Sequence, residues 1–395
     1  MLPPIPAGSV ALPVVVGLAF GTLLQKSRFC FVSALRDFVA RKETRVLHGL
    51  LAGVVVMTAF WSLQATLGLS AGFWTPDWGV TSFVGGLVFG VGMTVAGGCA
   101  AGTLYRACRG DLQFVLTLVF VLVGHVLFAA AYPFLRTVYF GPLRVGEGVS
   151  VYDLLPWPPI LTGLLAAGLV VLGYAFLAGR GSSRRRGTGA FEWRGTPDRG
   201  VDAAVVRGVV DLARAVRRHA TAVVTDERSL TARLRSPWDA RTSGVAMALV
   251  ASVWFAAHGA WGIAGSESRW VAWAFDRVGG DAARVTYWGS VLFDGAVAVT
   301  PDMVLFIAML VGMVGAAVLS GQFALRWPAE AGLFAPVVGG LLMGVGSRLG
   351  PGATIANLFS GLALLSAHSL LASAGVVVGV YVTTHWLRRG MGCAV

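Results

Sequence analysis

Nine apolar runs, each long enough to cross a lipid bilayer, determine what this chain can fold into. They lie near 8–24, 46–67, 80–96, 112–131, 158–178, 243–263, 302–321, 331–346 and 369–387. A run of ~17–25 mainly apolar residues spans the bilayer as a helix, because a helix satisfies its own backbone hydrogen bonds. Only 13% of the 395 residues are charged, about half the ~25% typical of soluble domains. The sequence therefore predicts an all-α, polytopic membrane protein with about nine spanning helices.

The basic residues predict the orientation of these helices. The net charge is +12, and basic clusters follow the first run, fill 180–241 with fourteen arginines, and end the last run. Lys and Arg gather in cytoplasmic loops near anionic lipid. We therefore expect a multi-pass membrane protein, with the N-terminus outside and 180–241 cytoplasmic. The lipid bilayer accounts for the positive charge, so no nucleic acid partner is predicted.

Two of the apolar runs end in a glycine-rich break that a short helical segment follows. The run 80–96 leads to Gly97-Gly98-Cys99, and the run 331–346 leads to Gly350-Pro-Gly352-Ala353. A broken helix is tolerated in a membrane only where it is buried in protein or lines a cavity, and two such breaks in similar halves indicate a transporter's binding site. We therefore expect an inverted repeat with re-entrant half-helices. Its parts are a first membrane repeat at 1–179, an Arg-rich cytoplasmic linker at 180–241 and a second membrane repeat at 242–395.

Cys99 lies where an anion would bind. It follows two glycines at the predicted N-terminus of a half-helix, where unpaired N–H groups and the helix dipole favour negative charge. Its sulfur is either a weak thiol donor or a thiolate; the plainer interpretation is a small residue packed between helices. We expect Gly97, Gly98 and Gly352 to shape a constriction, because a residue without Cβ lets the backbone approach a ligand.

Arginines beside these segments supply positive charge. Arg28 precedes Cys30 just after the first run, and it either attracts an anion or anchors the chain at the lipid headgroups. Arg348 lies at membrane depth between Gly346 and Gly350. A charge at that depth costs at least ~2.5–3.5 kcal/mol and needs a function or a partner. Either an anion pathway or a bond to nearby carbonyls would provide it.

The remaining polar residues indicate neither an enzyme nor a metal site. The four cysteines form no CxxC pair and no zinc spacing, so no metal, cofactor or disulfide framework is predicted. Cys108 and Cys393 are interpreted as structural. Ser360 and His368 form no recognisable hydrolytic site, because neither a nucleophile elbow nor a third catalytic residue is present.

Three motifs together resemble the YeeE/YedE family of bacterial inner-membrane proteins. They are Gln25-Lys-Ser-Arg-Phe-Cys30-Phe, Gly90-Val-Gly-Met-Thr-Val-Ala-Gly-Gly-Cys99, and the partial match Gly346-Ser-Arg-Leu that continues to Gly352, Ile355 and Leu-Phe-Ser-Gly361. The resemblance covers both apolar halves and excludes 180–241. It implies a permease that imports a small inorganic sulfur anion, most simply thiosulfate, without catalysis, and it implies a TusA-like cytoplasmic sulfur carrier as a partner.

The resemblance also assigns the pathway. It implies that Cys30 and Cys99 are two of the family's pathway cysteines, whereas the position of the third is Ala353 here. Thr354 and Asn357 are candidate replacement donors. Three alternatives remain open: a different sulfur or selenium species, a membrane subunit that relays sulfur through a cysteine persulfide, and a relative that binds without transporting.

Overall fold

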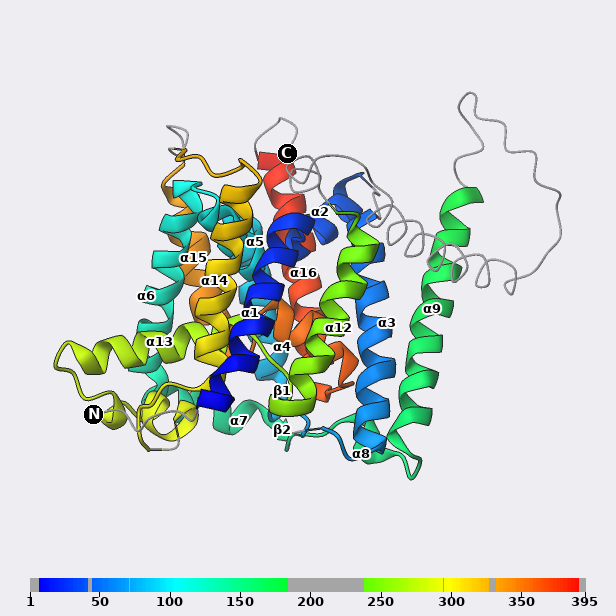
Figure 1. Cartoon of the computed structure of the whole chain (residues 1–395), viewed down its shortest axis with the longest axis horizontal. Coiled ribbons are helices and arrows are strands. Elements are labelled where there is room, and N and C mark those ends of the chain that lie inside the picture. The colour runs from blue at the N-terminus through cyan, green and yellow to red at the C-terminus, as the bar shows by residue number, and fades with distance from the viewer. Residues whose placement is uncertain are drawn as a thin grey trace.

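The computed structural model describes residues 7–41, 45–70, 72–183, 238–293, 295–326 and 332–390, and these residues are mainly helical (Figure 1). The longer helices are α1 (Ala7–Ser27), α2 (Phe31–Arg41), α3 (Arg45–Thr66), α4 (Val80–Ala96), α5 (Ala100–Cys108), α6 (Leu112–Leu135), α9 (Pro159–Ser183), α12 (Ala240–His258), α13 (Ile263–Arg277), α14 (Pro301–Leu319), α15 (Phe334–Leu349) and α16 (Ala367–Gly390). The short elements are α7 (Gly141–Leu143), α8 (Val151–Leu154), η2 (Ala282–Arg284), the π-helical segments η1 (Arg136–Phe140), η3 (Trp288–Leu292) and η4 (Ile355–Gly361), and an antiparallel pair, β1 (Trp78–Gly79) and β2 (Arg144–Gly146).

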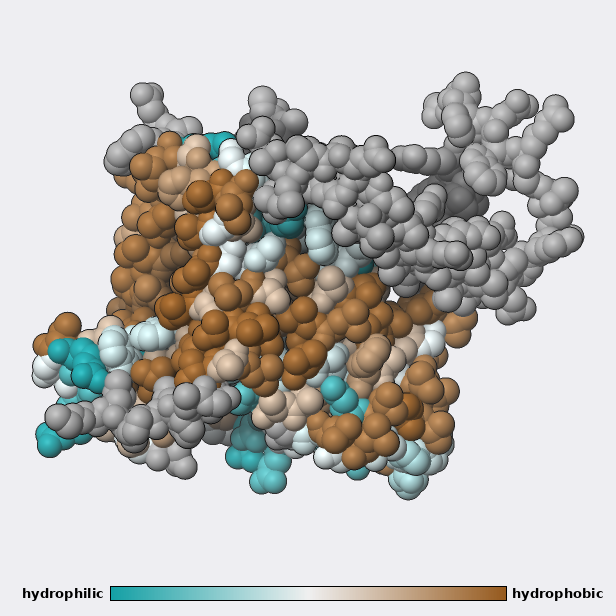
Figure 2. Space-filling model, in the orientation of Figure 1, coloured by the Kyte–Doolittle hydropathy of each residue, from teal (hydrophilic) through white to brown (hydrophobic). Residues whose placement is uncertain are grey.

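Each of the nine predicted apolar runs coincides with one of these helices. By length and composition, seven described helical stretches are able to cross a membrane, and α15 and the described apolar part of α9 are shorter. Figure 2 shows hydrophobic side chains across most of the described surface of one face of the molecule. The all-α, polytopic class is therefore confirmed. Residues 184–237 of the predicted linker lie outside the described residues, as does Cys393.

The helices pack in matched pairs across the two halves of the chain. In the first matched pair, α1 packs against α14 and α12 packs against α3, so α1 corresponds to α12 and α3 to α14. In the second, α4 packs against α16 and α15 packs against α6, so α4 corresponds to α15 and α6 to α16. The two helices that precede the breaks, α4 and α15, cross each other in antiparallel directions. Along this crossing Gly85 meets Gly350, Gly92 meets Met343, and Ala96 meets Gly339. Small residues allow this close backbone approach. Such packing stabilises helix pairs in a membrane, where the hydrophobic effect does not drive helices together.

The two ends of the bundle carry different segments. Figure 1 places the start of α1, the β1–β2 pair and α8 at the lower end, and the end of α9 with the start of α12 at the upper end. The N-terminal helix therefore begins at the end opposite the predicted linker. α13 lies across the bundle (Figure 1). η4 is a fully buried π-helical segment.

Candidate functional site

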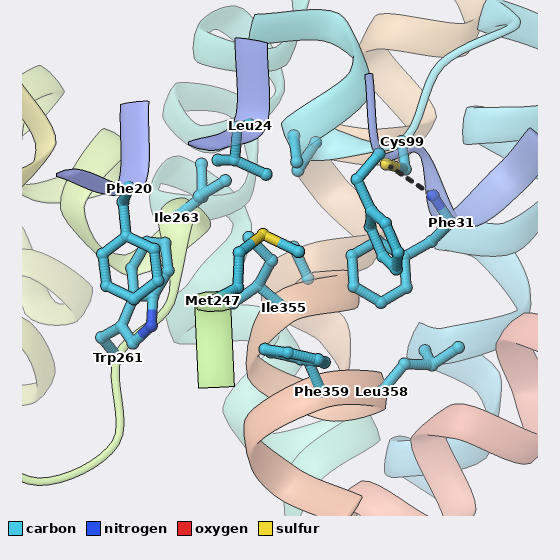
Figure 3. Close-up of a cluster of buried hydrophobic side chains, with 14 of the residues drawn as sticks. Phe20, Leu24, Phe31, Cys99, Met247, Trp261, Ile263, Ile355, Leu358 and Phe359 are labelled. Atoms are coloured by element: carbon cyan, nitrogen blue, oxygen red, sulfur yellow. Dashed lines mark hydrogen bonds between the residues drawn. The ribbon is translucent and has the colours of Figure 1, made fainter. Parts of the chain in front are cut away.

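The first break brings two cysteine thiols together. Cys99 caps the N-terminus of α5, and its Sγ accepts hydrogen bonds from the N–H groups of Gly102 and Phe31, each at 3.3 Å. Figure 3 shows the bond to Phe31. The Sγ of Cys30 lies 3.7 Å from the Sγ of Cys99, and both side chains are buried. The Cys99 sulfur thus occupies the position at a helix N-terminus that favours an anion.

The backbone around the pair depends on glycine. Gly97 ends α4 in the left-handed region, with φ +73°, and its carbonyl accepts a hydrogen bond from Arg106 Nη1 at 2.9 Å. A methyl group at Gly102 would lie 2.5 Å from the Cys30 Sγ. The absence of a side chain at Gly102 is therefore what allows Cys30 to approach the first turn of α5.

The second break is a polar loop between α15 and η4. Gly352 has φ +109°, and its carbonyl accepts a hydrogen bond from Asn357 Nδ2 at 3.1 Å. Ala353 and Thr354 follow and are buried, and the Thr354 hydroxyl has no hydrogen-bond partner. The residues that the sequence predicted for the second break, Gly352, Ala353, Thr354 and Asn357, thus lie together in one loop. Asn357 binds its own loop, whereas Thr354 retains an unused donor.

The second break borders a cavity of about 880 Å³ at the lower end of the bundle. Gly352 and Ala356 line it, together with aromatic residues such as Trp74, Trp261 and Tyr287. The charged or ionisable side chains around it are Asp77, Arg136, Arg144, His258, Arg269, Asp302 and Arg348. Four arginines therefore face two acids. Asp77 pairs with Arg144, and Asp302 pairs with Arg269, so the cavity has an excess of positive charge.

Arg348 is the most deeply buried of these arginines, with 5% of its surface exposed. Its Nη1 donates to the Tyr287 hydroxyl at 3.3 Å, and its Nε has no hydrogen-bond partner. Arg28, in contrast, is exposed and donates to the side chain of Gln322 at 3.3 Å. Of the two arginines singled out by the sequence, Arg348 therefore faces the cavity, whereas the exposed side chain of Arg28 bonds to Gln322.

An apolar layer separates this cavity from the cysteine pair. Ala356 of η4 faces the cavity, whereas Phe359 of the same segment packs against Phe31 with ring centroids 6.2 Å apart. Figure 3 shows Ile355, Leu358 and Phe359 on the side of Phe31 away from Cys99. π-Helical segments of this kind occur frequently at functional sites. Phe31, Phe359 and the two cysteines belong to the same buried hydrophobic core.

Sequence reasoning missed several residues of this region. Arg136, Arg144 and Arg269 come from three separate elements, and only the fold gathers them. The signal available for Arg106 was its position in the short segment after the first break. Ser360 and His368 do not bond to each other. His368 bonds to Ser82 at 2.8 Å and to the carbonyl of Pro351 at 2.7 Å, and Ser360 donates to the carbonyl of Trp261. Among the described residues no cluster of His, Cys, Asp and Glu forms a metal site.

Comparisons with known proteins agree with this architecture. The chain is 26% identical to the thiosulfate transporter TsuA of Spirochaeta thermophila over 393 residues, which cover 95% of this chain and 97% of the relative. It is 34% identical to the thiosulfate transporter TsuA of Escherichia coli over 101 residues, or 25% of this chain and 28% of the relative. It is 31% identical to the probable transporter YedE of Escherichia coli over 106 residues, or 27% of this chain and 26% of the relative.

The family match extends across both membrane halves. Residues 26–382 match the family described as "Sulphur transport". This range includes Cys30, Cys99 and the second break at Gly352. The relatives are transporters, so the prediction that the protein is not an enzyme is confirmed. The chain therefore belongs to the sulphur transport family, to which the YeeE/YedE proteins also belong.

Proposed function

We propose that this protein imports thiosulfate across the bacterial inner membrane through the two broken segments. The observation that carries the proposal is the pair of buried thiols, Cys30 and Cys99, at the N-terminus of α5 with their sulfurs 3.7 Å apart. Thiosulfate is a dianion with a soft terminal sulfur, and this site offers weak S–H donors with the positive end of a helix. The relative that aligns over nearly the whole chain is named a thiosulfate transporter.

The charges and the apolar layer assign an order of steps. The anion first enters the arginine-lined cavity, where the unpaired Nε of Arg348 is available as a donor. It then passes the second break at Gly352, which requires the layer around Phe359 to open. Beyond that layer, Cys99 is the central station and Cys30 the inner one. Neutral thiols bind weakly, and a pathway needs sites that hold an ion firmly enough to admit it and weakly enough to release it.

Ala353 gives the second break a different role from the first. A methyl group there offers no hydrogen bond, so in this proposal Thr354 supplies the polar contact that a cysteine would make. The Thr354 hydroxyl is buried and has no hydrogen-bond partner, so it is free to donate to a bound substrate. Gly352 keeps the backbone close to the passing anion, and Asn357 holds the loop in place.

The topology follows from the same proposal. The matched packing of α4 with α16 and of α15 with α6 supports an inverted repeat of 1–179 and 242–395. The start of α1 lies at the lower end in Figure 1, and so do β1 and β2, which carry Trp78 and Arg144 of the cavity lining. The start of α1 and the arginine-lined cavity would therefore face outside. The linker 180–241 would then be cytoplasmic, on the side where a TusA-like sulfur carrier would receive the imported sulfur.

The test is uptake of radiolabelled thiosulfate into proteoliposomes that contain the purified protein. We expect uptake by the native chain and its loss in Cys99→Ala. Cys108→Ala is the matched control, because Cys108 is a free, partly buried cysteine outside the pair. Equal uptake by native protein and Cys99→Ala would overturn the proposed site. Uptake only in Ala353→Cys would mean that the natural substrate is another sulfur or selenium anion.

The short distance between the sulfurs also supports a second candidate, a sulfur relay. The Cys99 thiolate would attack the terminal sulfur of thiosulfate, the bond between the two sulfurs of the substrate would break, and sulfite would leave with the electron pair. Cys99 would then carry a persulfide within reach of Cys30. Alkylation during turnover followed by mass spectrometry separates the two candidates. A persulfide on Cys99 favours the relay, and unmodified thiols during continued uptake favour the permease.

A further inference from the structure

A buried pair of ionisable side chains lies beside the two breaks, and the pathway described above does not use it. His125 of α6 and Glu267 of α13 approach to 3.5 Å between Nε2 and Oε2. The exposed fraction of the side chain is 0% for His125 and 4% for Glu267. Ionisable residues are rare at membrane depth because their burial is costly, and where they occur they often mark proton or ion pathways.

The surroundings of Glu267 connect it to the substrate pathway. It lines a small cavity of about 10 Å³ together with Thr103 of α5, Ser347 of α15 and Ala353 of the second break. Ala100, the first residue of α5 after Cys99, lines the same cavity. The carboxylate therefore lies between the two broken segments. A dianion held at the start of α5 would face this negative charge across a region of low dielectric, where repulsion is strong.

The hydrogen bonds around the pair leave room for a proton. The hydroxyl of Thr103 has no hydrogen-bond partner, and the backbone of Gly344 in α15 adjoins the His125 ring. Arg348 of α15 lies within electrostatic reach of the imidazole, and it also lines the large arginine-lined cavity. Four charged or phenolic groups on neighbouring elements are engaged elsewhere: Arg106 binds Gly97, Arg269 binds Asp302, Arg277 stacks on Trp273, and Tyr287 accepts from Arg348. Asp276 on α13 is exposed, and Tyr105, Cys108 and Tyr132 are the remaining ionisable groups on α5 and α6.

From this placement we infer that the His125–Glu267 pair binds a proton that travels with the sulfur anion. The proton enters from the arginine-lined cavity and joins the pair as the anion reaches the thiols. One positive charge is added, so the repulsion between Glu267 and the dianion disappears. When the anion leaves, the His125–Glu267 pair releases the proton to the other side. The inference rests on the proposed function, since it makes that transport a proton-coupled symport.

The experiment measures steady-state accumulation of radiolabelled thiosulfate in proteoliposomes, with the membrane potential held at zero by potassium and valinomycin. One proton moving with each anion raises the accumulation ratio by about tenfold for each pH unit of inward gradient. We expect this slope for the native protein and a ratio independent of the gradient for Glu267→Gln and for His125→Gln. Asp276→Asn is the control, because it removes an exposed acid from the same helix, α13, and it should retain the native slope.

The possible outcomes separate this inference from the proposed function. Thiosulfate that enters and equilibrates without response to the gradient would overturn the coupling and leave the import proposal standing. A native protein that admits no thiosulfate at all would overturn the import proposal itself. A gradient-dependent ratio in Glu267→Gln would show that the proton binds elsewhere. If either variant fails to fold, as judged by its thermal unfolding in detergent, the native slope still decides whether coupling exists and the other variant decides the site.

Discussion

Gly102→Ala adds a single methyl group at the point where the two thiols meet. Gly102 lies in the first turn of α5, and its N–H donates to the Cys99 Sγ. A methyl group there would lie 2.5 Å from the Cys30 Sγ and 3.4 Å from the Cys99 Sγ. Non-bonded atoms are at their optimum near ~3.5–4.0 Å, so the Cys30 sulfur must move away by about 1 Å. The bond from the Gly102 N–H to Cys99 remains available, and only the spacing of the thiols changes.

The energetic terms predict a folded protein with an impaired site. Replacing glycine by alanine inside a helix favours folding by about 1 kcal/mol, whereas overpacking of a buried position costs ~1–3 kcal/mol. The net loss of at most about 2 kcal/mol is smaller than the ~5–15 kcal/mol stability of a typical protein. Loss of one hydrogen bond between thiols and substrate, worth up to ~1.5 kcal/mol, corresponds to about tenfold in affinity. We therefore expect uptake at limiting thiosulfate to fall by about tenfold.

The measurement is the initial rate of thiosulfate uptake in proteoliposomes with equal amounts of each protein. Gly168→Ala in α9 is the matched control, because a methyl group at Gly168 meets no atom within 4 Å. It should keep the native rate. If Gly102→Ala transports within twofold of the native rate while Cys99→Ala is inactive, the spacing of Cys30 and Cys99 does not matter. The two-station pathway would then be wrong, although a site at Cys99 alone would survive.

Two further predictions concern the cavity and the helix crossing. Arg348→Gln should raise the thiosulfate concentration for half-maximal uptake by about tenfold, since the loss of ~1.4 kcal/mol of attraction is a tenfold change in binding. Arg284→Gln is the control, because the side chain of Arg284 is 88% exposed, and it should leave this concentration unchanged. An unchanged concentration in Arg348→Gln would exclude Arg348 from the route. Gly85→Ala should lower the free energy of unfolding by ~1–3 kcal/mol, because its methyl group would overlap the backbone of Gly350. Thermal unfolding in detergent measures the change, with Gly173→Ala as the control because a methyl group there meets no atom within 4 Å. Equal unfolding midpoints for the two variants would contradict the tight crossing.

The positions of the helices were predictable because the bilayer leaves the chain few choices. An apolar run at membrane depth must form a helix, so all nine runs were located to within a few residues. The π-helical form of η4 was not predictable. Its sequence, Ile355–Gly361, suits an ordinary helix, and its contacts with Phe31 and Trp261 come from segments far away in the chain.

The candidate site was predictable in its residue types but not in its arrangement. The two glycines before Cys99 indicated a helix break, and the position of Cys99 at the N-terminus of the next helix predicted an environment that favours an anion. The approach of Cys30, 69 positions earlier, depends on how α2 meets α5, which no local pattern encodes. Arg28 adjoins Cys30 in sequence, yet its backbone turns into the left-handed region at φ +51° and directs the side chain to Gln322. Nearness along the chain was therefore a poor guide to nearness in space.

In the proposed pathway, the two breaks divide the binding of an anion between them. In the first, both thiols and two backbone N–H groups converge, and the arginine of that half, Arg106, is directed to the carbonyl of Gly97. In the second, Ala353 has no donor, and the buried charge of Arg348 faces a large cavity. A strong charge suits attraction of an anion from water, whereas weak donors suit its release. In this proposal an alanine at residue 353 is therefore compatible with transport, because attraction at that end would rely on charge rather than on sulfur.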